Sequence, residues 1–208
     1  MIDPIRIGKQ LFPINRSLTG TGNLKTLKIL KKNINKLKIK YFKSGTIAFD
    51  WKIPNEYNVI DAYVIDKNKK KIIDFKKNNL HLVGYSEKIN KFLKRDQLIK
   101  KIYSDSEDES AIPYVTSYYK KDWGFCLSLK DKNEIKKNYK KNDKFKIVIN
   151  SYFKKKGKMH YGELVIPGKS KQEILISTYI CHPSMANNEL SGPLVALMLA
   201  KYFLKKKK

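Results

Sequence analysis

One stretch of aliphatic and β-branched residues constrains the fold of this chain more than any other feature. Residues 174–180 read ILISTYI, and such a continuous apolar run of strand length is typical of a strand buried on both faces of a sheet. A polar loop follows, and an apolar segment over residues 193–204 then begins with Pro193, which suits a first helical turn. This order of strand, loop and helix predicts an α/β fold that binds ligands at the carboxyl end of the strand.

The upstream sequence predicts one more helix and many short strands. Apolar residues recur at helical spacing among lysines over residues 22–35, which indicates an amphipathic helix. From Gly45 onward, short apolar runs alternate with turn residues, as in a small β-rich module. The expected strands of the chain before the apolar run cover residues 37–42, 60–65, 72–75, 80–85, 112–119, 123–129, 144–152 and 160–166.

Positive charge dominates the composition. The chain has 45 basic and 19 acidic residues, and a formal net charge of +26. This balance suggests a surface for nucleic acid or an acidic polysaccharide. However, Arg6, Arg16 and Arg95 are the only arginines, whereas readers of nucleic acid favour the bidentate fork of arginine. The lysines are spread along the whole chain. We therefore expect no specific nucleic-acid binding, and we keep polyanion binding as the alternative, non-enzymatic function.

The sequence predicts no membrane segment and no disulfide framework. No apolar run approaches the ~18 residues that a membrane span needs. Residues 1–10 mix charges with isoleucines and lack a cleavage site, so they do not resemble a signal peptide. We expect a cytoplasmic protein with no membrane partner. Cys126 and Cys181 are the only cysteines, and packing is the expected role of Cys181.

The loop after the apolar run carries the candidate site. His182 follows the expected strand directly, and Asn187, Asn188 and Glu189 lie on the same loop. An imidazole with a nearby carboxylate or amide can supply part of a zinc shell, but a catalytic zinc needs about three protein ligands. His81 and His160 are distant in sequence. A single histidine on a loop is more often a hydrogen-bonded structural residue, so both interpretations remain open at this point.

Several motifs together resemble a bacterial aminopeptidase-like family that is associated with polysaccharide-biosynthesis gene clusters and whose core is similar to the di-zinc aminopeptidases. The matching segments are residues 11–20 (LFPINRSLTG), 49–54 (FDWKIP), 61–63 (DAY), 79–81 (NLH), 111–119 (AIPYVTSYY), 123–126 (WGFC), 162–168 (GELVIPG) and 174–193. The resemblance implies an α/β fold with a zinc-aminopeptidase-like mixed sheet, incomplete in this chain. It places the core at residues 1–44 and 130–208, and an inserted small β-rich domain at residues 45–129.

The resemblance also assigns roles on the candidate loop. His182 matches the first zinc ligand, and Asn188 stands where the family has a metal-bridging aspartate. An amide neither neutralises nor bridges two cations well, which puts retention of zinc in question. Glu189 could substitute for the missing carboxylate, although its side chain is expected to point elsewhere. Ser184 stands where related enzymes carry an orienting aspartate, so Ser184, Asn187 and Glu189 are expected around the metal rather than on it.

The function implied by the resemblance is zinc-dependent hydrolysis of a peptide bond. The similar enzymes draw their general base and remaining zinc ligands from segments beyond Gly192, and this chain carries only one further helix after that residue. We therefore expect an incomplete or inactive metallohydrolase fragment. Its expected substrate is a peptide or a small amine-bearing molecule. The unpaired edge of such a half-sheet predicts self-association or a second chain that completes the fold.

Overall fold

Two separate hydrophobic cores divide the chain into two units. A computed structural model describes residues 3–206. Unit 1 comprises Met1–Glu56 and Lys154–Lys208, and unit 2 comprises Tyr57–Phe153. These bounds differ from the expected insertion at residues 45–129, because residues 130–153 supply a helix and a long strand to the core of unit 2.

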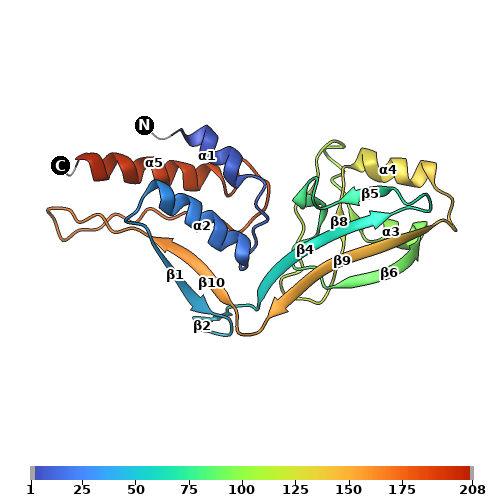
Figure 1. The fold of residues 1–208 in the computed structure, drawn as a ribbon, viewed down its shortest axis with the longest axis horizontal. Helices are drawn as coiled ribbons and strands as arrows, with labels where there is room; N and C mark the ends of the chain where they lie inside the picture. The colour runs from blue at the N-terminus through green and yellow to red at the C-terminus, as the bar shows by residue number, and fades with distance from the viewer. Residues whose placement is uncertain (1–2, 207–208) are drawn as a thin grey trace. The chain divides into compact units, whose positions relative to one another are not determined.

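Unit 1 packs three helices and an antiparallel strand pair around one core (Figure 1). Its elements are α1 (Pro4–Leu11), α2 (Thr21–Asn33), β1 (Lys38–Lys43), β2 (Ile47–Ala48), β3 (Trp51–Lys52), β10 (Lys158–Glu163) and α5 (Ser191–Lys206). Strand β1 pairs with β10, and β2 pairs with β3. Asp3 caps α1 by accepting a hydrogen bond from the backbone of Arg6 at 3.0 Å, and Pro4 opens that helix. The core joins Ile7 and Leu11 of α1 to Leu27 and Leu30 of α2 and Leu197 of α5.

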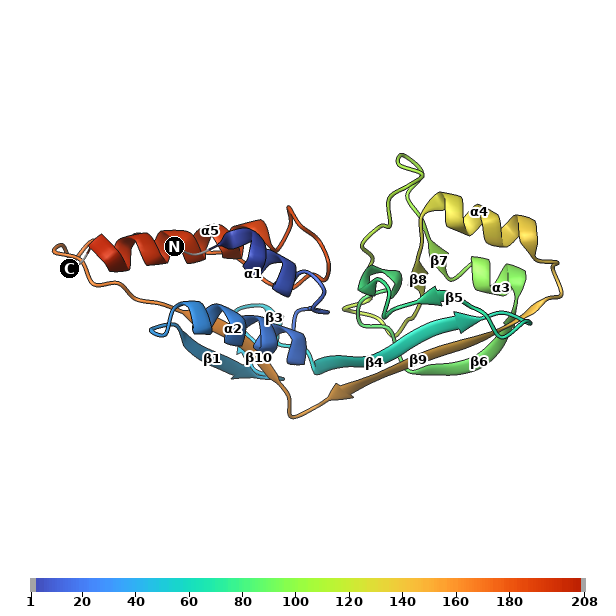
Figure 2. The same ribbon diagram turned by 45° about the horizontal axis from the view of Figure 1, so that its top comes forward.

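Unit 2 is built on a four-stranded sheet with the order β5-β4-β9-β6. Its elements are β4 (Glu56–Ile65), β5 (Lys71–Asp74), a 3-10 turn (Asn79–His81), β6 (Ile89–Lys94), α3 (Arg95–Ile99), β7 (Ile102–Tyr103), β8 (Phe125–Cys126), α4 (Leu129–Asn138) and β9 (Lys144–Lys154). Strands β7 and β8 form a separate short parallel pair. Figure 2 shows the helices of this unit on one side of the long strands. Phe145, Ile147 and Ile149 of β9 are fully buried in the core.

The two expected helices are present in the structure, whereas several apolar runs that were expected to be strands are not strands. The helices expected over residues 22–35 and 193–204 are confirmed as α2 and α5. Residues 112–119 form no strand, and Thr116 contributes only an isolated bridge to Gly84. Residues 80–85 begin in a 3-10 turn instead of a strand. The largest correction concerns residues 174–180, which form no strand among the described residues because no partner strand lies beside them.

The segment 174–180 is nevertheless held close to the start of α5. A Cβ atom added at Gly192 would lie 2.3 Å from Oγ1 of Thr178, so only glycine allows this close approach. Ile180 packs against the core of unit 1. The apolar segment therefore leads directly into the loop that carries the candidate site. Within residues 3–206, the structure contains no helix whose length and apolar character would allow it to cross a membrane.

Candidate metal centre

The loop between the apolar segment and α5 is anchored to α1. The hydroxyl of Ser184 donates to the backbone carbonyl of Phe12 at 3.0 Å, which satisfies one carbonyl at the end of that helix. Ser184 and Glu189 both have positive φ angles, of 35° and 69°. Non-glycine residues are uncommon in this region, and they concentrate at functional sites. The loop therefore has a defined shape that the surrounding structure imposes.

Three potential metal ligands converge on this loop. Cys181 Sγ, His182 Nδ1 and a carboxylate oxygen of Glu189 all lie within 4.8 Å of one another. The Glu189 carboxylate accepts hydrogen bonds from Cys181 Sγ at 3.0 Å and from the backbone N–H of His182 at 2.7 Å. Its Oε1 is also in direct contact with His182 Nδ1. The Glu189 side chain is fully buried, so these contacts replace the water that the carboxylate loses.

Burial and a nearby positive charge both favour the neutral form of the His182 imidazole. Burial lowers the pKa of the His182 imidazole, and the positive charge of Arg16 lowers it further. Burial raises the pKa of the Cys181 thiol, while Arg16 acts in the opposite direction. The Arg16 guanidinium is itself buried, and this desolvation lowers its pKa to about 10. A neutral imidazole is the form that binds metals.

This donor set fits a zinc ion. Thiolate, imidazole and carboxylate are the three side-chain ligands that zinc prefers, and catalytic zinc sites use three protein ligands. Soft thiolate disfavours magnesium and calcium, which prefer oxygen ligands alone. The nearby Arg16 opposes a cation, whereas the buried Glu189 carboxylate favours one. The chemistry of Cys181, His182 and Glu189 is thus compatible with zinc held by this loop.

The sequence-predicted site residues are partly brought together. His182 and Glu189 are in contact, and Ser184 anchors the loop. Asn188 is half-buried beside Glu189, and Asn187 is exposed, with its backbone carbonyl accepting from the hydroxyl of Ser191 at 2.5 Å. These two asparagines and their proposed metal roles stay predictions. The other two histidines lie elsewhere, in the 3-10 turn of unit 2 and in β10.

Sequence reasoning missed three features of this site. The Glu189 side chain points toward His182, although it was expected to point elsewhere, because its left-handed backbone turns it back into the loop. The sequence predicts a packing role for Cys181, whereas its thiol donates to the same carboxylate. Arg16 carried no signal except its place in the motif at residues 11–20. Only the fold brings it next to residues that lie far along the chain.

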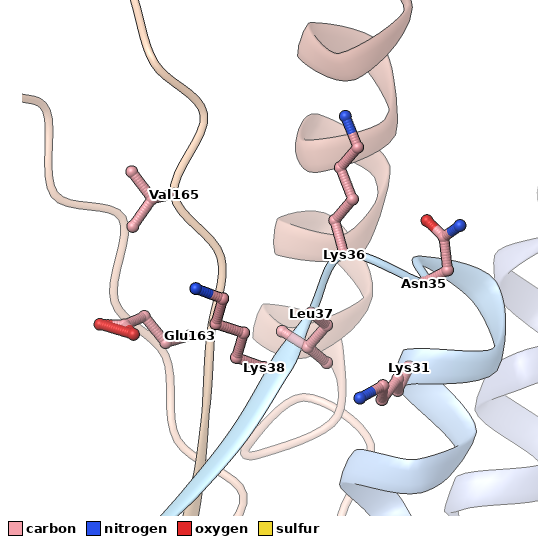
Figure 3. Close-up of a pocket in the computed structure, with 7 residues that line it drawn as sticks. All are labelled: Lys31, Asn35, Lys36, Leu37, Lys38, Glu163 and Val165. Carbon is pink, nitrogen blue, oxygen red and sulfur yellow. The ribbon is translucent and has the colours of Figure 1, made fainter.

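A cleft of unit 1, apart from the candidate metal centre, has three lysines among its seven lining residues. It has a volume of about 390 Å³ and lies where α2 leads into β1, with Val165 and Glu163 on its other side (Figure 3). Figure 3 shows the side chains of Lys31, Lys36 and Lys38 around this cleft. Glu163 forms an ion pair with Lys40. The cleft contains none of the three potential metal ligands and is basic in character.

Comparison with known protein families gives one match over almost the whole chain. The family model described as domain of unknown function DUF4910 matches residues 6–208. A protein of Clostridium acetobutylicum, named as a candidate polysaccharide biosynthesis protein with an aminopeptidase-like domain, is 43% identical over 199 residues. The match covers 96% of this chain and 44% of that relative, so the chain spans less than half of the relative's length.

Solved structures give a consistent result. The crystal structure of a candidate peptidase from Clostridium acetobutylicum superimposes with a TM-score of 0.90 at 41% identity, covering 97% of this chain and 46% of that one. An aminopeptidase from Aneurinibacillus sp. strain AM-1 aligns with a TM-score of 0.39 at 10% identity, which is too distant to support an argument. The expected mixed α/β class and the resemblance to aminopeptidase-like proteins are confirmed.

Proposed function

Because this chain belongs to the DUF4910 family, we propose that it forms the N-terminal portion of an aminopeptidase-like metallohydrolase and supplies one side of its zinc site. The observation that carries this proposal is the buried Glu189 carboxylate, which contacts Nδ1 of His182 and accepts from its backbone N–H at 2.7 Å. The proposed substrate is a peptide or a small amine-bearing molecule, from the aminopeptidase-like character of the relative.

In this proposal, His182 binds the metal and Glu189 positions His182. A carboxylate that holds one ring nitrogen of a histidine fixes the tautomer in which the other ring nitrogen binds the metal. Glu189 contacts Nδ1 and also accepts from the His182 backbone, so it fixes both the ring and the chain that carries it. Bound zinc would lower the pKa of a coordinated water and so supply a nucleophile at neutral pH.

Hydrolysis would need groups that this loop does not provide. The Glu189 carboxylate is committed to three contacts within the loop, which leaves it poorly suited to act as a general base. The amide of Asn188 cannot bridge two cations as an aspartate does. We therefore infer that the base and the remaining ligands come from the part of the family fold that this chain does not cover, and that the chain alone releases no amino acid from peptides.

Zinc titration by calorimetry tests this assignment. We expect binding of one zinc ion to the purified chain, loss of that binding in His182→Ala, and a 10- to 100-fold weaker affinity in Glu189→Gln, as for other residues that orient a metal-bound histidine. His160→Ala is the matched control and should bind as the original chain does. Unchanged zinc affinity in His182→Ala would contradict the proposal, and complete loss in Glu189→Gln would make Glu189 a direct ligand.

Binding of a polyanion remains the alternative function. The net charge of +26 and the lysine-lined cleft favour it. The presence of Glu163 in the cleft and the scarcity of arginine favour general electrostatic attraction over a specific site.

A further inference from the structure

One face of the four-stranded sheet in unit 2 is left uncovered by the helices of that unit. Helices α3 and α4 pack on the other face, where Leu98 and Ile135 join the core (Figure 2). Because side chains alternate between the two faces of a strand, every second residue of β6 and β9 points away from these helices. We call this surface the open sheet face. Its residues on the two strands are Asn90, Phe92, Lys94, Lys144, Lys146, Val148, Asn150 and Tyr152.

An exposed aromatic ring with lysines beside it lies on the open sheet face. Phe92 of β6 is 63% exposed. It pairs with Lys146 of β9, whose Nζ is 5.6 Å from the centre of the ring. Lys94 lies two residues further along β6, a distance of about 6.5 Å in an extended strand, and pairs with Lys144. Three ammonium groups therefore lie near one flat apolar ring.

The neighbouring strand β4 adds a second ring, and the acidic groups near it are already paired. Tyr63 lies between two buried core residues, so its ring is on the open sheet face. The Nζ of Lys71 is 4.4 Å from the centre of this ring. Asp61 and Asp74 each form an ion pair with a lysine, at 3.0 Å and 3.6 Å. The three lysines near Phe92 form no ion pair within the described residues, so their charge is available to an anion.

The chemistry of these side chains decides between the possible occupants of the open sheet face. A second copy of the chain would bring another formal charge of +26 against the first, and like charges of this size oppose association. An acidic polysaccharide would need acceptors for its hydroxyl groups, whereas lysine only donates. A single-stranded nucleic acid combines phosphates, which accept from lysine, with flat bases that can stack on Phe92. The open sheet face thus matches a single strand best.

We propose that the open sheet face binds single-stranded nucleic acid without sequence preference, with a base stacked on Phe92 and phosphates held by the three lysines near it. Exposed aromatic rings combined with basic side chains bind single strands in this way in other proteins, and some RNA-binding domains use an open four-stranded sheet. Stacking needs no arginine fork, so the scarcity of arginine does not oppose it. The proposal goes beyond general attraction of polyanions, because it depends on a ring, and it is independent of the candidate metal centre.

Fluorescence anisotropy of the whole chain with a labelled eight-nucleotide DNA of mixed sequence tests the proposal. We expect the single strand to bind at least about tenfold more tightly than a duplex of the same length, because paired bases cannot stack on Phe92. A strand of eight thymidines should bind about as tightly as the mixed sequence, since every base has a flat face. Equal or tighter binding of the duplex overturns the proposal.

Variants of Phe92 separate stacking from charge. Phe92→Leu keeps an apolar side chain without the ring and should weaken binding of the single strand at least about fivefold, whereas Phe92→Trp should retain it. Both variants should keep the thermal midpoint of the chain, because the side chain is mostly exposed. Tyr119→Leu changes an exposed tyrosine outside the sheet of the same unit and is the control. Unchanged affinity in Phe92→Leu would leave only electrostatic attraction and overturn the proposal.

Variants of the lysines separate the open sheet face from the net charge. Lys94→Gln with Lys146→Gln should lower the slope of log affinity against log salt concentration by about 1.4, since each phosphate contact of a single strand contributes about 0.7. Lys136→Gln with Lys137→Gln removes the same charge from the exposed side of α4 and should leave the slope unchanged. Equal effects of the two pairs overturn the proposal, as does tighter binding of a heparin fragment of the same charge. Dimers that dissociate in Phe92→Leu, measured by light scattering, would assign the face to a second copy and also overturn it.

Discussion

At the scale of single residues, Arg16 shows how an unfavourable group is retained in unit 1. It is 2% exposed, and its Nη1 donates to the carbonyl of Leu11 at 2.7 Å. Its Nε and Nη2 have no partner among the described residues. The lowering of its pKa to about 10 corresponds to about 3 kcal/mol against the charged form. A buried charge with so few hydrogen bonds is destabilising. We therefore expect that Arg16 is retained for a role other than stability.

Replacement of Arg16 should therefore stabilise the chain. We expect Arg16→Met to raise the free energy of unfolding of unit 1 by about 1 kcal/mol, because the carbonyl of Leu11 still accepts from the backbone of Ile14 at 3.1 Å. Urea unfolding followed by Trp51 fluorescence in a Trp123→Phe background reports on unit 1 alone. Destabilisation by more than 1 kcal/mol would instead show that capping the end of α1 outweighs the cost of burial.

At the scale of elements, Asp66 ties the β4–β5 turn to the end of α4. Its carboxylate accepts from the backbones of Asn68 at 2.9 Å and Lys70 at 2.8 Å, and from the hydroxyl of Tyr139 at 2.8 Å. Burial works to raise the pKa of Asp66, but these hydrogen bonds outweigh it and lower the pKa below its ordinary value. The same contact contributes to the raised pKa of Tyr139, for which burial is the larger cause.

The depressed pKa of Asp66 gives unit 2 a stability that depends on pH. A carboxyl group whose pKa is lower in the folded state contributes its full stabilisation of the fold at pH values above its unfolded pKa of about 4. This contribution is lost as the pH falls through the pKa of the folded state. Asp66→Asn should lower the free energy of unfolding of unit 2 by about 1–2 kcal/mol at pH 7. It should also weaken the dependence of that free energy on pH below pH 4. Urea unfolding monitored by Trp123 fluorescence measures both effects. Glu107→Gln, an exposed change in the same unit, is the control and should alter neither.

The elements also show how far the sequence could predict the structure. Helix α2 was predictable from its apolar periodicity and helix α5 from its apolar content after Pro193, because both signals are local. The same holds for the longer strands. The environment of residues 174–180 was not predictable, because a β-branched run becomes a strand only when another strand pairs with it. His182 and Glu189 could be chosen as site residues from their position on one loop. Their contact could not, because it depends on a positive φ at a residue other than glycine.

At the scale of the whole molecule, net charge sets how the chain meets polyanions. With +26 spread over mostly exposed lysines, we expect retention on heparin that falls steeply as salt rises, because screening shortens electrostatic reach to about 8 Å at physiological ionic strength. The pair Lys36→Gln and Lys38→Gln in the cleft should shift elution no more than the pair Lys155→Gln and Lys156→Gln on the surface. A larger shift for the cleft pair would reveal a specific polyanion site.

The way the chain enters and leaves unit 2 has a consequence for how such proteins diversify. The last residue before unit 2 and the first after it are joined by an ion pair, at 3.4 Å between Glu56 Oε1 and Lys154 Nζ. Glu56 also accepts from the backbone of Lys158 at 3.0 Å, which closes unit 1 across the interruption. The two chain ends at the junction are therefore adjacent within unit 1. The intervening module can lengthen, shrink or be exchanged over evolutionary time without altering the register of the β1–β10 strand pair in unit 1.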